Sequence, residues 1–264
     1  MSDQAAGVPR IGDPAPAFTA QTTLGPLSFP TDLRGKWVVL FSYAADFSPV
    51  CATEVLAFAR ACPAFREANC ELIGLSADGI YAHIAWVRRL EELSESRGGH
   101  VSVAFPIIAD LAGAVARLYG MIHPHSSATQ AAGSTFIIDP SGVVRVIAHC
   151  PPGIGRSVVE IQRLLAALQH AEEYDIATPA DWHLGEDVVV PAPKTVDLAQ
   201  ECTEGLDGYE CADWFLCFKT CPHGSPPRLG PLEARTRDTS AEWPCAGRAS
   251  VDAAGGAAVE SVPL

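Results

Sequence analysis

The order of strand-like and helix-like segments constrains the fold of this chain more than any other feature of its sequence. Two near-continuous apolar runs, residues 36–42 and 71–76, have the length and composition of strands that are buried on both faces. Between them, residues 51–68 carry apolar side chains at helical spacing. This order implies two parallel strands joined by a right-handed crossover. Pro63 lies inside the helical segment and is expected to kink it, because proline cannot donate to the carbonyl four residues earlier.

The segments that follow extend the same pattern. We expect helices at residues 80–94, 111–119 and 157–169, and strands at residues 105–108, 134–139 and 143–149. The last two strands are separated by Pro140, Ser141 and Gly142, which favour a tight turn and therefore an antiparallel hairpin. The chain is thus predicted to be α/β, with a mixed central sheet flanked by helices on both faces. This is a thioredoxin-like fold.

Composition divides the 264 residues into four parts. Residues 1–10 are polar and are expected to be a flexible N-terminus. Residues 11–173 form the thioredoxin-like domain, because 48% hydrophobic content suffices for a sizeable core. Residues 174–223 form a C-terminal arm with proline-punctuated connections and several cysteines. Residues 224–264 are rich in small residues and proline and are expected to be disordered.

Charge and cysteine content narrow the classes of partner. A net charge of −13 argues against nucleic acid and anionic membranes as main partners. The longest apolar runs are strand-length, far short of the roughly 18 residues that a membrane span needs. No signal peptide is visible after Met1, so we expect a cytoplasmic protein. In that reducing compartment, its nine cysteines are more often free, catalytic or metal-bound than joined in structural disulfides.

The sharpest local feature is the segment of residues 45–54, which follows a buried strand and opens a helix. Cys51 falls in the first helical turn, where free backbone N–H groups and the helix dipole favour a thiolate. Ser48 can direct its hydroxyl at the sulfur or at a substrate oxygen, and Glu54 could orient an arginine. The alternative is a buried cysteine that acts as a small hydrophobic side chain. Because Ser48 replaces a second cysteine at this spacing, thioredoxin-like dithiol exchange is not expected here.

A series of short motifs occurs in an order typical of one protein family. They lie at residues 11–16, 47–51, 73–76, 105–110, 136–139, 155–156, 177–182 and 213–217. In these motifs the chain resembles the peroxiredoxins, which are thiol peroxidases on a thioredoxin fold. It is most similar to the long subgroup of 1-Cys, peroxiredoxin-6-like enzymes and their archaeal relatives.

The resemblance assigns roles to individual residues. It implies that Cys51 is the peroxidatic cysteine, whose thiolate attacks the peroxide O–O bond, becomes a sulfenic acid and is recycled by a thiol. It further implies a catalytic set of Cys51, Ser48, Glu54 and Arg156. It implies a peroxide or other small-molecule substrate, an external thiol reductant and no cofactor or metal. Homodimers or rings of dimers are expected, with the C-terminal arm reaching over a partner.

The active-site pattern departs from the family at several positions. Ala44 and Ser48 replace a proline and a threonine, and Tyr43 stands where many subgroup members have histidine. Gly133 occupies the position of the arginine that holds the thiolate and polarises the peroxide, whereas Arg156 matches the second pocket arginine. Losing one such donor commonly costs about 10²–10³ in rate. We therefore expect a weakened peroxidase that reduces hydrogen peroxide or small organic hydroperoxides.

Other substitutions are compatible with a pocket rebuilt for another purpose. His149 and Cys150 replace two aromatic residues of the subgroup, either through drift at a strand end or to add a base or a second thiol. The loop with His123 and His125 could border the pocket. On this alternative, the chain is a peroxiredoxin-fold protein repurposed as a small-molecule tailoring enzyme or as a non-catalytic redox or binding protein.

The remaining cysteines have different expected roles. Cys217 matches a C-terminal cysteine that archaeal relatives keep, so it is a candidate resolving thiol. Scattered free cysteines, or a metal site of Cys217, Cys221 and His223, are the alternatives. Cys62 and Cys70 fall on core-facing positions and are interpreted as non-catalytic.

Overall fold

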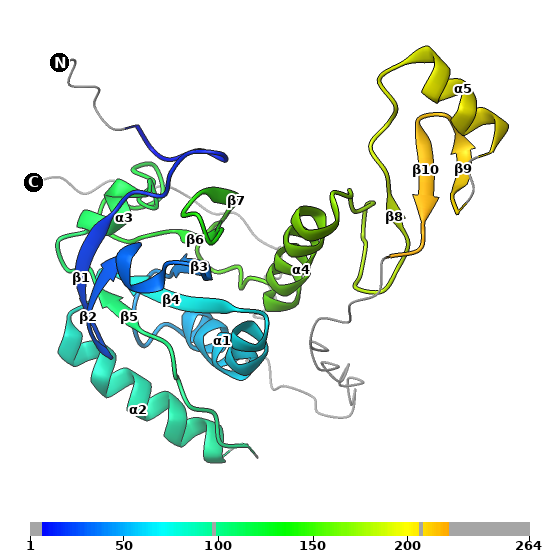
Figure 1. Ribbon diagram of the computed structural model, residues 1–264. Coiled ribbons are helices and arrows are strands. Elements are labelled where there is room, and N and C mark those ends of the chain that lie inside the picture. Colours follow the sequence, from blue (N-terminus) through cyan, green and yellow to red (C-terminus); the bar gives the residue numbers. More distant parts are fainter. Residues whose placement is uncertain (1–6, 97–98, 206–207, 222–264) are drawn as a thin grey trace, which may run out of the picture. The chain divides into compact units, whose positions relative to one another are not determined.

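The computed structural model describes residues 7–96, 99–205 and 208–221 (Figure 1). At its centre, β3 (Trp37–Ser42) is buried along its whole length. It pairs in parallel with β4 (Cys70–Ser76), in a register that runs from Trp37 opposite Cys70 to Ser42 opposite Leu75. The crossover between them is α1 (Pro49–Glu67), which continues through Pro63. The parallel strand pair expected from the apolar runs is therefore confirmed.

The main sheet has seven strands in the order β2-β1-β5-β4-β3-β6-β7. Its other strands are β1 (Phe18–Thr22), β2 (Gly25–Phe29), β5 (Ile107–Ala109), β6 (Gly133–Ile138) and β7 (Val144–Cys150). Strands β3, β4 and β5 are mutually parallel, whereas β6 runs antiparallel to β3 and forms a hairpin with β7. The mixed sheet is confirmed. The β1–β2 hairpin was not expected from the sequence.

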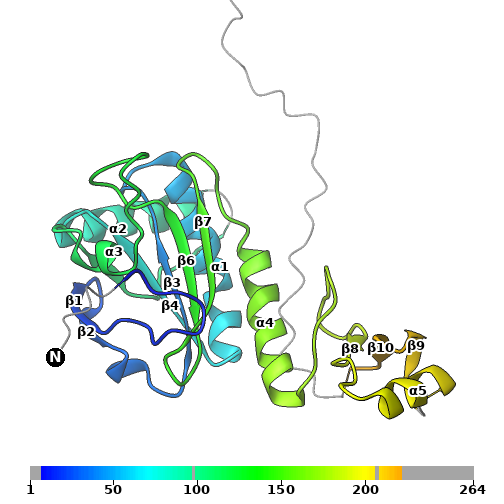
Figure 2. The same cartoon turned by 90° about the horizontal axis from the view of Figure 1, so that it is seen from above.

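Helices cover both faces of this sheet. Alternate residues of β3 face opposite sides, as strand geometry requires, so that Val39 and Phe41 enter one core and Val38 and Leu40 the other. The first core is closed by α1, α2 (Ile80–Ser96) and α4 (Val158–Tyr174), and the second by the β1–β2 hairpin and α3 (Ala114–Leu118). Helices α1 and α4 lie side by side (Figure 2). The two-faced thioredoxin-like architecture is thus confirmed.

Helix α3 begins three residues later than expected. Gly113 precedes it in a left-handed conformation, with φ of 63°. The carboxylate of Asp110 accepts hydrogen bonds from the backbone N–H groups of Val115 and Ala116, at 3.2 and 2.7 Å. The Asp110 carboxylate thus takes the place of backbone carbonyl oxygens as acceptor for the first N–H groups of α3. Residues 111–113 therefore form a turn and not a helical turn.

The arm contains a second, three-stranded sheet in the order β8-β10-β9. Its elements are β8 (Val188–Val189), α5 (Val196–Glu204), β9 (Glu210–Asp213) and β10 (Leu216–Lys219). The chain enters this sheet after Trp182, whose fully buried side chain packs with Ala166 and Ala167 of α4. The predicted boundaries at residues 10, 173 and 223 stay predictions. Residues 1–6, His223 and the tail 224–264 lie outside the described residues.

Candidate active site

Cys51 lies in the first turn of α1, as the sequence predicts. The helix begins at Pro49, whose fixed φ suits the first helical position, and Ser48 is its N-cap residue. The Cys51 side chain is only 5% exposed and packs in the core cluster that also contains Tyr43 and Val55. The sulfur is therefore held at a helix start, but under the protein surface.

Ser48 makes an unusual N-cap. Its backbone carbonyl accepts the hydrogen bond of Ala52 at 2.9 Å, but its side chain caps none of the N–H groups of the first turn. The half-buried hydroxyl is therefore not committed to the helix and is free to serve a ligand.

A buried ion pair lies one turn further along α1. The Arg156 Nε and Nη2 atoms donate to Glu54 Oε1 and Oε2 at 2.7 and 2.8 Å, and the Arg156 backbone N–H donates to Oε1 at 2.8 Å. The side chains are 4% and 6% exposed. Such a two-pronged contact fixes both position and orientation of the guanidinium. Glu54 follows Cys51 by three residues, so the two share one face of the helix.

Arg156 is also fixed by the sheet beneath it. Its Nη1 donates to the Ser134 carbonyl at 2.9 Å and to Thr135 Oγ1 at 3.3 Å. The guanidinium carbon lies 5.5 and 5.7 Å from the ring centres of Phe41 and Phe58. These contacts leave the cation little freedom to turn.

Gly133 lies beside this arginine. It opens β6, opposite Cys150 of β7. A Cβ added to Gly133 would lie 3.4 Å from the Cys150 carbonyl oxygen and 3.7 Å from Arg156 Nε, which are ordinary contacts. Its φ is outside the left-handed region. The backbone therefore does not require glycine here, and the position directly adjoins the ion pair.

Cys150 also lines a largely apolar cavity of about 400 Å³. It is lined by His123, Pro124, His125, Ser126, Ala132, His149, Cys150, Pro151 and Pro152. His149 and Cys150, both singled out in the sequence, line this cavity; Gly133 pairs with Cys150 in the sheet but is not among the lining residues. Tyr43 is not among the lining residues and is buried against α2.

Two of the three histidines that line the cavity, His123 and His149, face each other edge-on, with ring centres 5.0 Å apart. His149 Nδ1 lies 2.8 Å from Ser134 Oγ. Within residues 7–96, 99–205 and 208–221, the buried Nε2 of His123 finds no hydrogen-bond partner. Partial burial and the neighbouring His123 both lower the pKa of His149.

The other cysteines divide into buried thiols and one disulfide. Cys62 and Cys70 are buried, as expected, and burial is the main cause that raises the pKa of each thiol. Cys217, for which the sequence left a resolving thiol, a free cysteine or a metal ligand open, forms a disulfide with Cys211, because β9 and β10 place the two residues opposite each other with Cα atoms 4.0 Å apart. The role of Cys217 as a resolving thiol stays a prediction.

Two of the chain's polar residues were not singled out from the sequence. Asp46 and His83 form a buried contact at the loop before Cys51. They are far apart in the chain, and a histidine on a helix gives no local sign that its partner is a carboxylate.

In the described part of the chain, no cluster of three metal-ligating side chains occurs. None of the helices described there is long and apolar enough to cross a membrane.

Comparison with known proteins places this chain in a family. Residues 11–147 match the AhpC/TSA family, and residues 167–205 match the C-terminal domain of 1-Cys peroxiredoxin. A peroxiredoxin of Methanosarcina mazei is 47% identical over 214 residues, which cover 80% of this chain and 98% of that protein. The chain belongs to the peroxiredoxin family. It is accordingly an oxidoreductase of the thiol peroxidase class, as the resemblance predicts.

Further relatives agree. A peroxiredoxin of Aquifex aeolicus is 45% identical, over 80% of this chain and 97% of that protein. The structure of yeast mitochondrial 1-Cys peroxiredoxin is similar with a TM-score of 0.67 and 33% identity, over 80% of this chain and 99% of that one. Peroxiredoxin 6 of Arenicola marina gives a TM-score of 0.71 at 28% identity, over 83% of this chain and 100% of that one. Likeness along so much of each chain does not favour a repurposed fold.

The lowered pKa of His149 predicts a pH-dependent contribution to stability. Below its ordinary value of 6.5, the unfolded chain binds a proton at His149 more readily than the folded chain does. Stability should therefore fall as the pH decreases through this range, and His149→Gln should flatten the fall. Urea unfolding at pH 7.5 and 5.5 measures the difference. An equal pH effect in both proteins would contradict the assignment.

Proposed function

We propose that Cys51 is the peroxidatic cysteine of this peroxiredoxin. Its thiolate attacks one oxygen of the peroxide, the O–O bond breaks, and the other oxygen leaves as hydroxide or alkoxide and takes up a proton. The sulfur becomes a sulfenic acid. A thiol then attacks that sulfur, water leaves, and a disulfide forms that further thiol reduces. The location of Cys51 in the first turn of α1, on the face where Glu54 holds Arg156, is the observation that carries this proposal.

The surroundings of the other thiols support the choice of Cys51. Nucleophilic attack requires a thiolate, and burial keeps Cys62 and Cys70 protonated by raising their pKa values. Cys51 is buried too, but it lies among the free N–H groups of a helix start. In this mechanism Ser48 hydrogen-bonds a peroxide oxygen, and Arg156 offers positive charge next to it.

The cavity beside Gly133 supports small organic hydroperoxides as substrates along with hydrogen peroxide. Its largely apolar walls suit an organic group, and Nε2 of His123, which has no hydrogen-bond partner among the residues that the structure describes, suits a polar atom on that group. Cys150 in the cavity wall pairs with Gly133 across the β6–β7 ladder, and His149 lies next to it. Because Gly133 supplies no donor, we propose that the peroxidase is weaker than one with arginine at this position.

We further propose a cytoplasmic homodimer or ring of dimers that depends on an external thiol. Strand β7 lies at the edge of the seven-stranded sheet, and such an edge can pair with another copy. The free thiols of Cys51, Cys150 and Cys202 fit a reducing compartment. For yeast mitochondrial 1-Cys peroxiredoxin, thiol resolution is described via glutathione/thioredoxin systems. A small thiol or a thioredoxin-like protein is the reductant class we propose here.

Cys51 should be the first cysteine to be oxidised. After treatment with less than one equivalent of hydrogen peroxide, mass spectrometry should find sulfenic or sulfinic acid at Cys51 before any other thiol. Cys51→Ser should abolish peroxide consumption, whereas Cys202→Ser on α5 should retain it. Oxidation of Cys150 first, with Cys51 still reduced, would show that the assignment is wrong.

Gly133→Arg should accelerate peroxide consumption, because it restores a cation next to Arg156. We expect a gain of at least about tenfold, since losing one such donor commonly costs about 10²–10³. Gly133→Met supplies similar length without charge and is the matched control. Stopped-flow kinetics measure the rates, and thermal unfolding verifies that both variants fold. A folded Gly133→Arg protein without any gain would contradict the idea of a weakened site.

Cys217 is our candidate for the resolving thiol, which requires that its disulfide with Cys211 be reduced first. In pre-reduced protein, one equivalent of peroxide should produce a disulfide-linked dimer on non-reducing electrophoresis. Cys217→Ser should abolish this dimer, and Cys202→Ser should not. Persistent sulfenic acid on Cys51 without a linked dimer would instead identify an enzyme that uses only an external thiol.

A further inference from the structure

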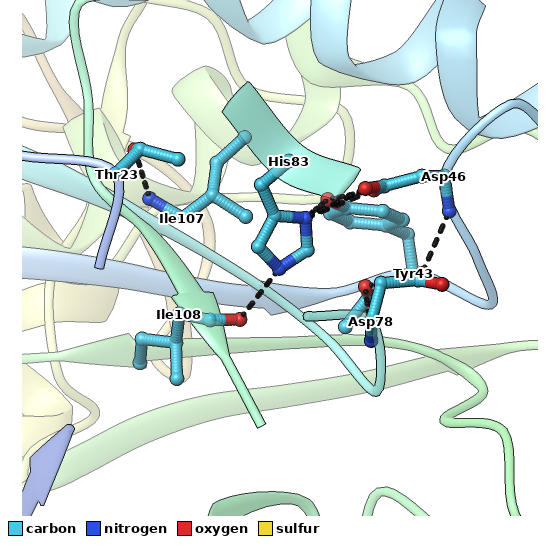
Figure 3. Close-up of polar contacts among 8 residues, drawn as sticks. Thr23, Tyr43, Asp46, Asp78, His83, Ile107 and Ile108 are labelled. Atoms are coloured by element: carbon cyan, nitrogen blue, oxygen red, sulfur yellow. Dashed lines mark hydrogen bonds and ion pairs between the residues drawn. The ribbon is translucent and has the colours of Figure 1, made fainter. Parts of the chain in front are cut away.

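A fully buried histidine connects α2 to the loop that leads to Cys51. This loop, residues 43–48, is called the Cys51 loop below. His83 is 0% exposed, and its Nδ1 lies 2.8 Å from Asp46 Oδ2 and 3.1 Å from Oδ1 (Figure 3). On the opposite side of the ring, Nε2 lies 3.2 Å from the carbonyl oxygen of Ile108 in β5. The imidazole thus bridges the Cys51 loop and the sheet.

The partners of the ring decide where its hydrogens lie. A carbonyl oxygen only accepts, so Nε2 of His83 carries a hydrogen. The Nδ1–Oδ2 contact is a hydrogen bond only if a second hydrogen lies between the two atoms, bonded either to Nδ1 of His83 or to Oδ2 of Asp46. Both ring nitrogens are therefore fully used. A buried pair of this kind seldom adds net stability, because removing both groups from water is costly. The contribution of the pair is to hold the Cys51 loop in position against α2 and the sheet.

Two further bonds hold the same aspartate. The Tyr43 hydroxyl donates to Asp46 Oδ1 at 2.9 Å, and burial followed by the charge of Asp46 raises the pKa of Tyr43, so the hydroxyl keeps its proton. The backbone N–H of Asp46 donates to Asp78 Oδ2 at 2.8 Å, and the hydroxyl of Ser76 donates to that same oxygen at 2.8 Å. The Cys51 loop is thus tied at Asp46 through both its side chain and its backbone.

The next residue shows that the loop needs such ties. Phe47 has a φ of 59°, a left-handed conformation that is unfavourable for a bulky residue. Its side chain is 63% exposed, so burial offsets little of that strain. A loop with a strained residue beside its anchor relaxes when the anchor is removed.

We propose that Asp46, His83 and Tyr43 form a latch that holds the Cys51 loop closed, and that release of this latch exposes the Cys51 sulfur to thiols. Cys51 follows Asp46 by five residues and is 5% exposed, so a resolving thiol cannot reach it in the closed state. The first turn of α1 opens easily, because its N–H groups have no partners within the helix. The importance of the latch for catalysis rests on the proposed role of Cys51, whereas its effect on the exposure of the Cys51 sulfur does not.

The test measures access to Cys51 in the fully reduced, full-length protein. Each thiol is labelled with a bulky maleimide and, separately, with the small reagent methyl methanethiosulfonate, and mass spectrometry gives a rate for each cysteine. The ratio of the bulky to the small rate reports access rather than reactivity. Cys62 and Cys70 are buried elsewhere and report global unfolding. Since no peroxide is used, the result does not depend on the peroxidatic role of Cys51.

His83→Phe keeps a ring but removes both hydrogen bonds, and should raise the ratio at Cys51 by about tenfold or more. The ratios at Cys62 and Cys70 should not change. Asp46→Asn is the conservative control: its amide can donate to Nδ1 and its oxygen can accept from Tyr43. It should therefore behave like the unaltered protein. Leu90→Ala weakens the packing of α2 away from the latch and should not raise the Cys51 ratio selectively.

An unchanged Cys51 ratio in His83→Phe overturns the proposal. So does an equal rise at Cys51, Cys62 and Cys70, which indicates a loss of the whole fold. Should His83→Phe fail to fold, Tyr43→Phe removes a single hydroxyl and should raise the Cys51 ratio about fivefold. An unchanged ratio in Tyr43→Phe overturns the proposal in that case.

Discussion

The buried contact between Glu54 and Arg156 is the interaction on which the rest of the site depends. Two nearly inaccessible charges can be tolerated only as partners, so neither residue can move without stranding the other. Arg156 enters from the segment before α4 and also binds β6, whereas Glu54 belongs to α1. One ion pair therefore holds α1, β6 and the segment before α4 against one another. Because Cys51 lies on α1, its position depends on that arrangement.

The same pair limits what the site can offer a thiolate. The charge of Arg156 is already matched by Glu54, and its Nη1 donates to the β6 backbone and to Thr135. Gly133 contributes no second cation. On the proposed role of Cys51, stabilisation of its thiolate therefore falls largely to the free N–H groups of the helix start.

Patterns that are local in sequence allowed the correct predictions. The apolar runs of β3 and β4 show that both strands are buried, and the rule of right-handed crossovers makes them parallel neighbours. The position of the core and the location of Cys51 at the start of the connecting helix could therefore be predicted. The missed features depend on residues that are distant along the chain. His83 meets Asp46 only once α2 packs on the sheet, and Cys217 meets Cys211 only once the arm forms its own strands. Neither contact leaves a periodic signal.

The burial of Trp182 limits how the C-terminal arm could be lost during evolution. Its indole is buried against Ala166 and Ala167, residues of a helix that also packs on the main core. Residues on both sides of position 173 therefore share one hydrophobic cluster. Loss of the arm by a simple deletion would uncover an apolar stripe on α4, so an armless descendant would first need polar substitutions on that helix. The arm differs from the main domain in composition, but it is attached to α4 by a hydrophobic cluster of its own.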